Sequence, residues 1–159
     1  MIKIICIGKI KEKYLKEAIE EYSKRLSKYT KLEIIELPDE PVIEKAKKVE
    51  AERIIKHIKD NEYIITLEIE GNKLSSEELS KKIENTLITN SNITFIIGGS
   101  YGLDDSIKER SNYKISFSNL TFPHQLFRVM LLEQIYRSFK IINNENYHKW
   151  IKNKKTAQY

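Results

Sequence analysis

The strongest constraint on the fold is a regular alternation of short apolar runs with longer amphipathic segments. Five apolar runs are predicted to be strands, at residues 2–7, 32–37, 63–67, 93–97 and 113–117. Helices are predicted at residues 14–29, 42–59, 75–90, 104–111 and 123–143. Strands separated by helices indicate an α/β fold with a mostly parallel sheet. The first run is rich in isoleucine with little alternation, so we expect helices on both faces of the sheet.

The length and composition fit one soluble domain. The chain has 159 residues, which is enough to bury a sizeable core, and it contains no linker, internal repeat or low-complexity segment. We therefore predict a single domain over residues 1–159, with residues 150–159 as a flexible basic tail. No apolar run approaches the roughly 20 residues that cross a bilayer, and the apolar start is too short for a secretory signal. A cytoplasmic protein without membrane contact is expected.

Cys6 is the only cysteine of the chain. A single cysteine excludes an internal disulfide framework and fits a reducing compartment. Cys6 lies inside the first apolar run, so we interpret it as a small buried hydrophobic residue rather than a nucleophile.

The charge is mildly basic and unevenly distributed. Lys and Arg number 28 against 23 Asp and Glu, which gives a net charge of +5 and a pI near 9.1. Basic residues gather near both ends of the chain, while the acidic residues concentrate in the middle. Two basic ends would suit a polyanion such as a nucleic acid, although solvated lysine faces are the usual reason for such a pattern.

A glycine-rich turn follows the fourth predicted strand. It contains Gly98, Gly99 and Gly102, and glycines at such a turn let a ligand approach the backbone closely. The spacing is neither that of a dinucleotide-binding fingerprint nor that of a phosphate-binding loop. A tight turn that needs a positive φ explains these glycines equally well.

The positions of three strand ends favour a ligand site. Ligands of open α/β sheets bind beyond the carboxyl ends of strands, and Leu67, Gly98 and Phe117 all fall near such ends. The loop after the fifth strand mixes hydrogen-bonding groups with apolar side chains: Phe117, Ser118, Asn119, Leu120, Thr121 and Phe122. This mixture suits a ligand with a planar ring and polar groups. Each hydroxyl taken singly is also a common helix cap.

The last predicted helix begins with two residues of chemical interest. His124 lies where the helix dipole disfavours a charged imidazole, so it is either a base or a structural residue. Arg128 follows four residues later, so both side chains are expected on the side of the helix that faces the strand ends. Three histidines and one cysteine without ligand spacing give no metal site, and no nucleophile motif is present.

Several motifs together resemble the RlmH family, also called YbeA or OrfX. They are IGKIKEKY at residues 7–14, TLEIEG at 66–71, IGGSYGL at 97–103, SNYKISFSNLTFPHQLFRVMLLEQIYRSFKI at 111–141 and NYHK at 146–149. The resemblance covers nearly the whole chain as far as Lys149, and its most specific part is the Phe-Pro-His-Gln run. Members of the family usually end near this point, whereas this chain continues for ten residues.

The resemblance implies a fold and an activity. The family are SPOUT-class methyltransferases with a C-terminal trefoil knot and a homodimeric assembly. They transfer a methyl group from S-adenosylmethionine to N3 of a pseudouridine in helix 69 of 23S ribosomal RNA, and they act on the assembled 70S ribosome. The family's cofactor contacts match Leu67, Gly98 and residues 117–122, with no metal. The knot follows from the resemblance alone, because knots are very rare in proteins.

The catalytic residues are left as hypotheses. The N3 atom must lose a proton before it attacks, which calls for a base or for a charge that stabilises the anion. Arg128 and His148 are the candidates, and a homodimer would allow the partner subunit's His148 to complete the site. The alternative function is a ribosome- or RNA-binding protein that retains the fold without catalysis.

Overall fold

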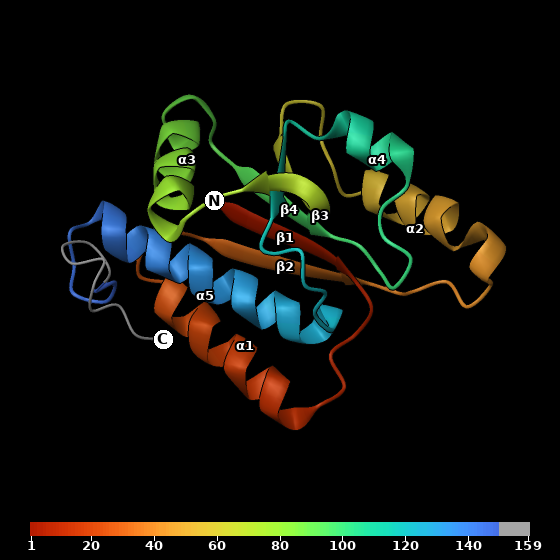
Figure 1. Ribbon diagram of the computed structural model, residues 1–159, viewed down its shortest axis with the longest axis horizontal. Helices are drawn as coiled ribbons and strands as arrows, with labels where there is room; N and C mark the ends of the chain where they lie inside the picture. Colours follow the sequence, from red (N-terminus) through yellow and green to blue (C-terminus); the bar gives the residue numbers. More distant parts are fainter. Residues whose placement is uncertain (150–159) are drawn as a thin grey trace.

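A five-stranded parallel sheet forms the centre of the computed structural model, which describes residues 1–149 (Figure 1). The strand order is β2-β1-β4-β3-β5, and every neighbouring pair is parallel. The strands are β1 (Ile2–Ile7), β2 (Leu32–Leu37), β3 (Tyr63–Lys73), β4 (Ile93–Ile97) and β5 (Tyr113–Ser116). The basic tail predicted at residues 150–159 lies outside the described residues.

Helices cover both faces of the sheet, as Figure 1 shows. One face carries α1 (Lys13–Leu26), α3 (Ser76–Thr89) and α5 (His124–Ile142), and the other carries α2 (Ala46–Ile55) and α4 (Asp105–Arg110). Alternate residues of β1 belong to the two cores: Ile4 and Cys6 pack with the first group, Ile5 and Ile7 with the second. The predicted α/β class and parallel sheet are confirmed. The trefoil knot stays a prediction.

The first helix is shorter than the predicted range of residues 14–29. It ends at Leu26, and the chain then turns, with the amide of Tyr29 donating to the carbonyl of Leu26 at 2.9 Å. The ring of Tyr29 stacks on Phe139 of α5 with centroids 5.9 Å apart. Because this stacking requires the chain to leave the helix axis, the tertiary contact overrides the helical pattern of the sequence.

The second helix is also shorter than predicted, at both ends. A 3-10 turn, η1 (Ile43–Lys45), precedes α2, and α2 stops at Ile55 instead of continuing to Lys59. The backbone carbonyls that follow α2 accept hydrogen bonds from side chains elsewhere in the chain. Lys3 Nζ donates to the carbonyl of His57 at 2.6 Å, and the Arg110 guanidinium donates to the carbonyl of Lys59 at 3.1 Å.

The third strand extends beyond its predicted end and bends around β5. Both Leu67 and Asn72 are in register with Ile115, so the residues between them form an irregularity in the ladder. Gly71 lies in this bend, where an added Cβ would be only 2.6 Å from the carbonyl carbon of Ile115. Glycine is therefore required there, because the two backbones are in direct contact.

The starts of two helices show how local sequence sets the ends of the elements. Ser75 and Glu78 form the predicted capping box of α3, with each side chain accepting from the other residue's backbone amide at 3.1 Å. The fifth helix begins at His124, one position later than predicted, and Pro123 is its N-cap residue rather than part of the first turn. Cys6 is fully buried, and burial raises the pKa of its thiol to about 12, in agreement with the expected hydrophobic role. Within residues 1–149, none of the helices is long and apolar enough to span a membrane.

Candidate functional site

A cavity of about 370 Å³ opens at the carboxyl ends of β3, β4 and β5, beside the start of α5. The residues that line it come from these strand ends, the glycine-rich turn, the loop before α5 and the first turn of α5: Leu67, Glu68, Ile69, Ile97, Gly98, Gly99, Ser100, Gly102, Leu103, Ile115, Ser116, Phe117, Ser118, Leu120, Thr121, Phe122, Pro123, His124 and Phe127. Of the residues predicted to bind a cofactor, all except Asn119 line this one cavity. Asn119 lies in the same loop and is exposed.

The glycine-rich turn forms the first wall. The amide of Gly102 donates to the carbonyl of Gly99 at 3.0 Å, and Gly102 has a φ of +81°, so the turn needs glycine at this position. A Cβ on Gly98 would lie 3.0 Å from the carbonyl carbon of Gly102. The glycines therefore make a tight turn, as one interpretation of the sequence expected. The same turn presents backbone without side chains to the cavity, as the other interpretation required.

The loop between β5 and α5 forms the second wall and is held by its own hydrogen bonds. Ser116 Oγ donates to the carbonyl of Ser118 at 3.1 Å, and Ser118 Oγ accepts from the amide of Leu120 at 3.0 Å. These bonds fix the loop backbone, as Ser side chains commonly do in turns. The wall is thus shaped before any ligand enters.

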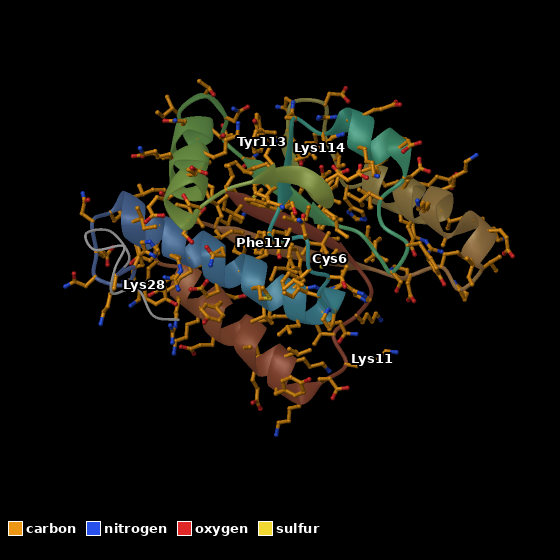
Figure 2. All side chains as sticks on the ribbon, viewed as in Figure 1. Cys6, Lys11, Lys28, Tyr113, Lys114 and Phe117 are labelled. Carbon is orange, nitrogen blue, oxygen red and sulfur yellow. The ribbon has the colours of Figure 1, made fainter. Side chains whose placement is uncertain are left out.

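Three aromatic rings line this second wall. The ring of Phe127 lies 4.7 Å from that of Phe117 and 6.1 Å from that of Phe122, measured between centroids. Figure 2 shows Phe117 between the end of β5 and α5. Rings at this spacing support one another and offer an apolar surface to a planar ligand.

The bend of β3 forms the third wall, through Leu67, Glu68 and Ile69, which lie where the regular ladder with β5 is interrupted. The Glu68 carboxylate is held in place, because it accepts from Thr66 Oγ1 at 2.6 Å and lies 3.8 Å from Lys108 Nζ. An anchored carboxylate at a cavity wall can accept hydrogen bonds from hydroxyl or amino groups of a ligand.

His124 lines the cavity at the start of α5, where the first backbone amides of the helix have no intrahelical partner. Arg128 lies one turn further on and does not line the cavity. It is 1% exposed, and its guanidinium donates to Glu36 Oε2 at 2.6 Å and to the carbonyl of Gly8 at 3.0 Å. Its Nε is buried without a partner in residues 1–149. Arg128 therefore holds the end of β1 and the end of β2 together, next to His124 in the fold.

His148 lies elsewhere, in a polar cluster with Arg137 of α5 and Glu77 of α3. Arg137 Nη1 is 3.0 Å from His148 Nδ1, and Glu77 Oε1 is 2.9 Å from His148 Nε2. A guanidinium can only donate, so Nδ1 is the acceptor in the contact with Arg137, and Nε2 faces the Glu77 carboxylate. Burial alone would raise the pKa of the Glu77 carboxyl, but hydrogen bonds, led by that from His148, hold this pKa below its ordinary value.

The two catalytic candidates are not brought together within one subunit. Arg137, which contacts His148, lies nine residues beyond Arg128 on α5. This separation is about 14 Å along the helix axis at 1.5 Å per residue. A site that used both Arg128 and His148 would therefore need His148 from a second copy of the chain.

A second cavity, of about 460 Å³, lies between α3, α5 and β5. It shares Ile115, Ser116 and Phe117 with the first cavity, so the end of β5 separates the two. Glu133 lines it and accepts from the hydroxyl of Tyr147 at 3.1 Å, which places the His148 cluster at its border.

Three residues near the cavity were not predicted from the sequence. Phe127 lines the cavity, and its place on an amphipathic helix gave no sign of this role. Glu36 binds Arg128 but looks like an ordinary polar residue at the end of a strand. Glu50 of α2 is 4% exposed, and one of its carboxylate oxygens would be 3.0 Å from a Cβ at Gly99. In residues 1–149 no group of three or more His, Cys, Asp or Glu side chains could hold a metal ion.

The arrangement suits a small molecule with a planar ring and several polar groups. Bare backbone, three aromatic rings, hydroxyl groups and one anchored carboxylate converge on a cavity of the size typical for such ligands. The cavity also occupies the carboxyl edge of the sheet, where α/β proteins bind their ligands.

Comparisons with known proteins agree with this placement. A family model described as "Predicted SPOUT methyltransferase" matches residues 1–148. The chain is 56% identical to ribosomal RNA large subunit methyltransferase H of Clostridium perfringens, over 93% of this chain and 99% of that protein. It is 58% identical, with the same coverage, to the protein of that name in Clostridium botulinum. The chain therefore belongs to the SPOUT methyltransferase family, in its RlmH group.

Proposed function

We propose that the protein methylates large-subunit ribosomal RNA with S-adenosylmethionine as the methyl donor. The observation that carries this proposal is the cavity beside β3, β4 and β5, because all the residues expected from the family resemblance to bind the cofactor, except Asn119, line it. The family membership and the printed names of the relatives, which are ribosomal RNA methyltransferases, support the same conclusion.

The cavity fits the proposed cofactor chemically. The rings of Phe117, Phe122 and Phe127 offer a wall for a purine, and the glycine backbone at Gly98 allows close approach. The Glu68 carboxylate offers an acceptor for hydroxyl or ammonium groups. When bound, S-adenosylmethionine supplies a methyl group that is electrophilic because it is attached to a positively charged sulfur.

The protein's own residues then have to orient the reactants rather than activate the donor. The loop of residues 117–122 is already fixed by the hydrogen bonds of Ser116 and Ser118, so little order is lost on binding. Arg128 does not line the cavity and its charge is paired with Glu36, so its proposed role is to hold the ends of β1 and β2 next to His124.

The proposed target is N3 of a pseudouridine in helix 69 of 23S ribosomal RNA, within the 70S ribosome. This detail rests on the resemblance to the RlmH group. A substrate of this kind places the protein in the cytoplasm. The proposed assembly is a homodimer, in which the partner subunit's His148 removes the N3 proton. Within its own subunit the Nδ1 lone pair of His148 is engaged by Arg137, so this role requires His148 to leave that contact before it accepts the proton.

The test is methyl transfer from labelled S-adenosylmethionine to free 23S RNA, to separate ribosomal subunits and to 70S ribosomes in parallel. The expected result is incorporation into 70S ribosomes at one pseudouridine, seen as a block to reverse transcription because an N3 methyl group occupies the pairing edge of the base. No transfer to any of the three substrates would overturn the proposal.

Two further measurements separate the parts of the proposal. Calorimetric titration with S-adenosylmethionine should show saturable binding, whereas a protein that only binds RNA would show none. Arg128→Ala and His148→Ala should each slow methyl transfer while the cofactor still binds. If both variants kept the wild-type rate with normal cofactor binding, the assignment of these two residues would be wrong.

A further inference from the structure

The loop between β1 and α1 carries unpaired positive charge beside the cavity. Lys9, Lys11 and Lys16 are exposed, and within residues 1–149 their ammonium groups make no ion pair. Tyr14 lies among them in the first turn of α1 and is 66% exposed. We call these four residues the basic rim. The same segment also carries exposed Glu12, and Glu17, which lies 3.8 Å from Lys13, so its net charge is smaller than the number of lysines. Figure 2 shows the side chain of Lys11 pointing away from the molecule.

The basic rim has a rigid support. Ile10 is buried, at 8% exposed, and its amide donates to Glu36 Oε2 at 3.0 Å. The amide of Lys11 donates to Gln125 Oε1 on α5 at 3.3 Å, and the carbonyl of Gly8 accepts from Arg128. In Figure 1 the loop passes beside the start of α5. Because His124 in that first turn lines the cavity, the loop that carries Lys9 and Lys11 lies next to the cavity, and Tyr14 and Lys16 follow it in the first turn of α1.

Carboxylates lie at or next to the walls formed by β3 and the glycine-rich turn. Glu68 belongs to the cavity wall, Glu70 is an exposed residue two positions on, and Asp104 and Asp105 come directly after Leu103 of the wall. Lysines offset part of this charge, because Lys108 Nζ lies 3.8 Å from Glu68 and the charges of Lys47 and Lys48 act on Asp104. The lysines of the β1–α1 loop have no such partners among the described residues, so they are the stronger attraction for a polyanion.

We propose that the basic rim is the docking surface for the RNA strand that flanks the target nucleotide. Lys9, Lys11 and Lys16 bind phosphate groups of the backbone, and the ring of Tyr14 stacks on an unpaired base. Rigid support of the loop by Glu36 and Gln125 sets the distance between this strand and the cavity. This inference rests on the proposed function, since it names where that function's RNA substrate binds.

The lysines are tested by a triple variant, Lys9→Gln, Lys11→Gln and Lys16→Gln. Its matched control is Lys24→Gln, Lys56→Gln and Lys81→Gln, which removes the same charge from exposed lysines of α1, the end of α2 and α3 that do not line the cavity. Binding to 70S ribosomes is measured by co-sedimentation over a range of salt concentrations, and cofactor affinity by calorimetry. The rim variant should bind ribosomes at least tenfold more weakly, with a shallower salt dependence by up to about one charge per lysine. The control should differ from wild type by less than threefold.

The stacking role is tested by Tyr14→Leu against Tyr14→Phe. Loss of one stacked ring should weaken ribosome binding at least fivefold, and phenylalanine should restore it because it keeps the aromatic face. Neither variant should alter cofactor affinity or the thermal midpoint, since the ring is largely exposed.

The outcomes distinguish an error in the docking surface from an error in the proposed function. If the rim variant and its control bind ribosomes equally well, the docking surface is wrong, whether or not the protein methylates. Failure of the wild-type chain to bind ribosomes also overturns it. If wild type binds ribosomes through the rim but neither binds the cofactor nor transfers a methyl group, the docking surface stands and the proposed function fails.

Discussion

Arg128 Nη1 and Glu36 Oε2 lie 2.6 Å apart although 92 positions separate the two residues in the chain. The arginine is 1% exposed, whereas the glutamate side chain is 38% exposed. The same carboxylate oxygen accepts from the amide of Ile10. Glu36 thus joins the end of β2, the start of the β1–α1 loop and the first turns of α5, which are the elements beside the cavity.

Because Arg128 and Glu36 differ in burial, we expect substitution of each to lower the free energy of unfolding by a different amount. Glu36→Ala leaves a buried guanidinium with only the carbonyl of Gly8, and it should reduce the free energy of unfolding by about 2–4 kcal/mol. Arg128→Met removes the buried charge and leaves a carboxylate that water can reach, so about 1–2 kcal/mol is expected. Urea unfolding of both single variants and the double variant measures the difference. A larger loss for Arg128→Met would contradict this account.

Gly71 is predicted to be indispensable for the bend of β3. In Gly71→Ala the new Cβ would lie 2.6 Å from the carbonyl carbon of Ile115 and 2.8 Å from its nitrogen, and backbone atoms cannot move aside as a flexible side chain can. A loss above about 3 kcal/mol is expected, together with weaker cofactor binding, because β5 leads directly into the loop of residues 117–122. Glu70→Ala, at the exposed neighbouring position, is the control and should change stability by less than about 0.5 kcal/mol.

The buried pair of Lys3 and Glu62 should make stability depend on pH. Lys3 Nζ lies 2.8 Å from Glu62 Oε1, and Thr94 Oγ1 donates to Glu62 Oε2 at 2.6 Å. Burial would raise the pKa of the Glu62 carboxyl, but these hydrogen bonds and the charge of Lys3 hold it below its ordinary value. A carboxyl with a lowered pKa stabilises the fold above its unfolded pKa, near 4.3, and this contribution is lost as the pH falls through the folded pKa.

The test of this linkage is urea unfolding of wild type and Glu62→Gln between about pH 7 and pH 3. Glu62→Gln should be less stable at pH 7 by about 2–4 kcal/mol, and the difference should shrink as the pH falls. Glu84→Gln, at an exposed position of α3, is the control and should follow wild type at every pH. A difference between Glu62→Gln and wild type that stays constant with pH would rule out this role for Glu62.

The sequence predicted the parts of the fold that depend on local pattern. The bounds of β1, β2 and β4 agree with the prediction because each is a short apolar run with a clear end. The start of α3 agrees because the capping box of Ser75 and Glu78 is itself local. Where the prediction failed, a distant residue had competed with the local pattern, as Phe139 does for Tyr29 and Lys3 does for His57.

The candidate site could likewise be predicted only where it depends on local sequence pattern. The strand ends Leu67, Gly98 and Phe117 could be expected to meet, because the carboxyl ends of parallel strands share one edge of the sheet. The order of the strands, with β4 between β1 and β3, has no local signature. Contacts between elements far apart in the chain have no local signature either, so Glu36 beside Arg128 and Glu50 behind Gly99 could not be predicted.

Phe127 provides the sharpest test of the cavity, because the sequence pattern did not single it out. Its ring supports both Phe117 and Phe122, so Phe127→Ala should remove part of the wall and let the other two rings move. Affinity for S-adenosylmethionine should fall roughly tenfold to hundredfold, as expected for the loss of about 1.4–2.8 kcal/mol of binding energy. Leu126→Ala, at the adjacent exposed position that does not line the cavity, should stay within about twofold of wild type. Calorimetry measures both affinities, and thermal unfolding shows whether each variant is folded at the temperature used. Equal affinities of two folded variants would place the cofactor away from this aromatic wall, and the cavity at the ends of β3, β4 and β5 would then need another ligand.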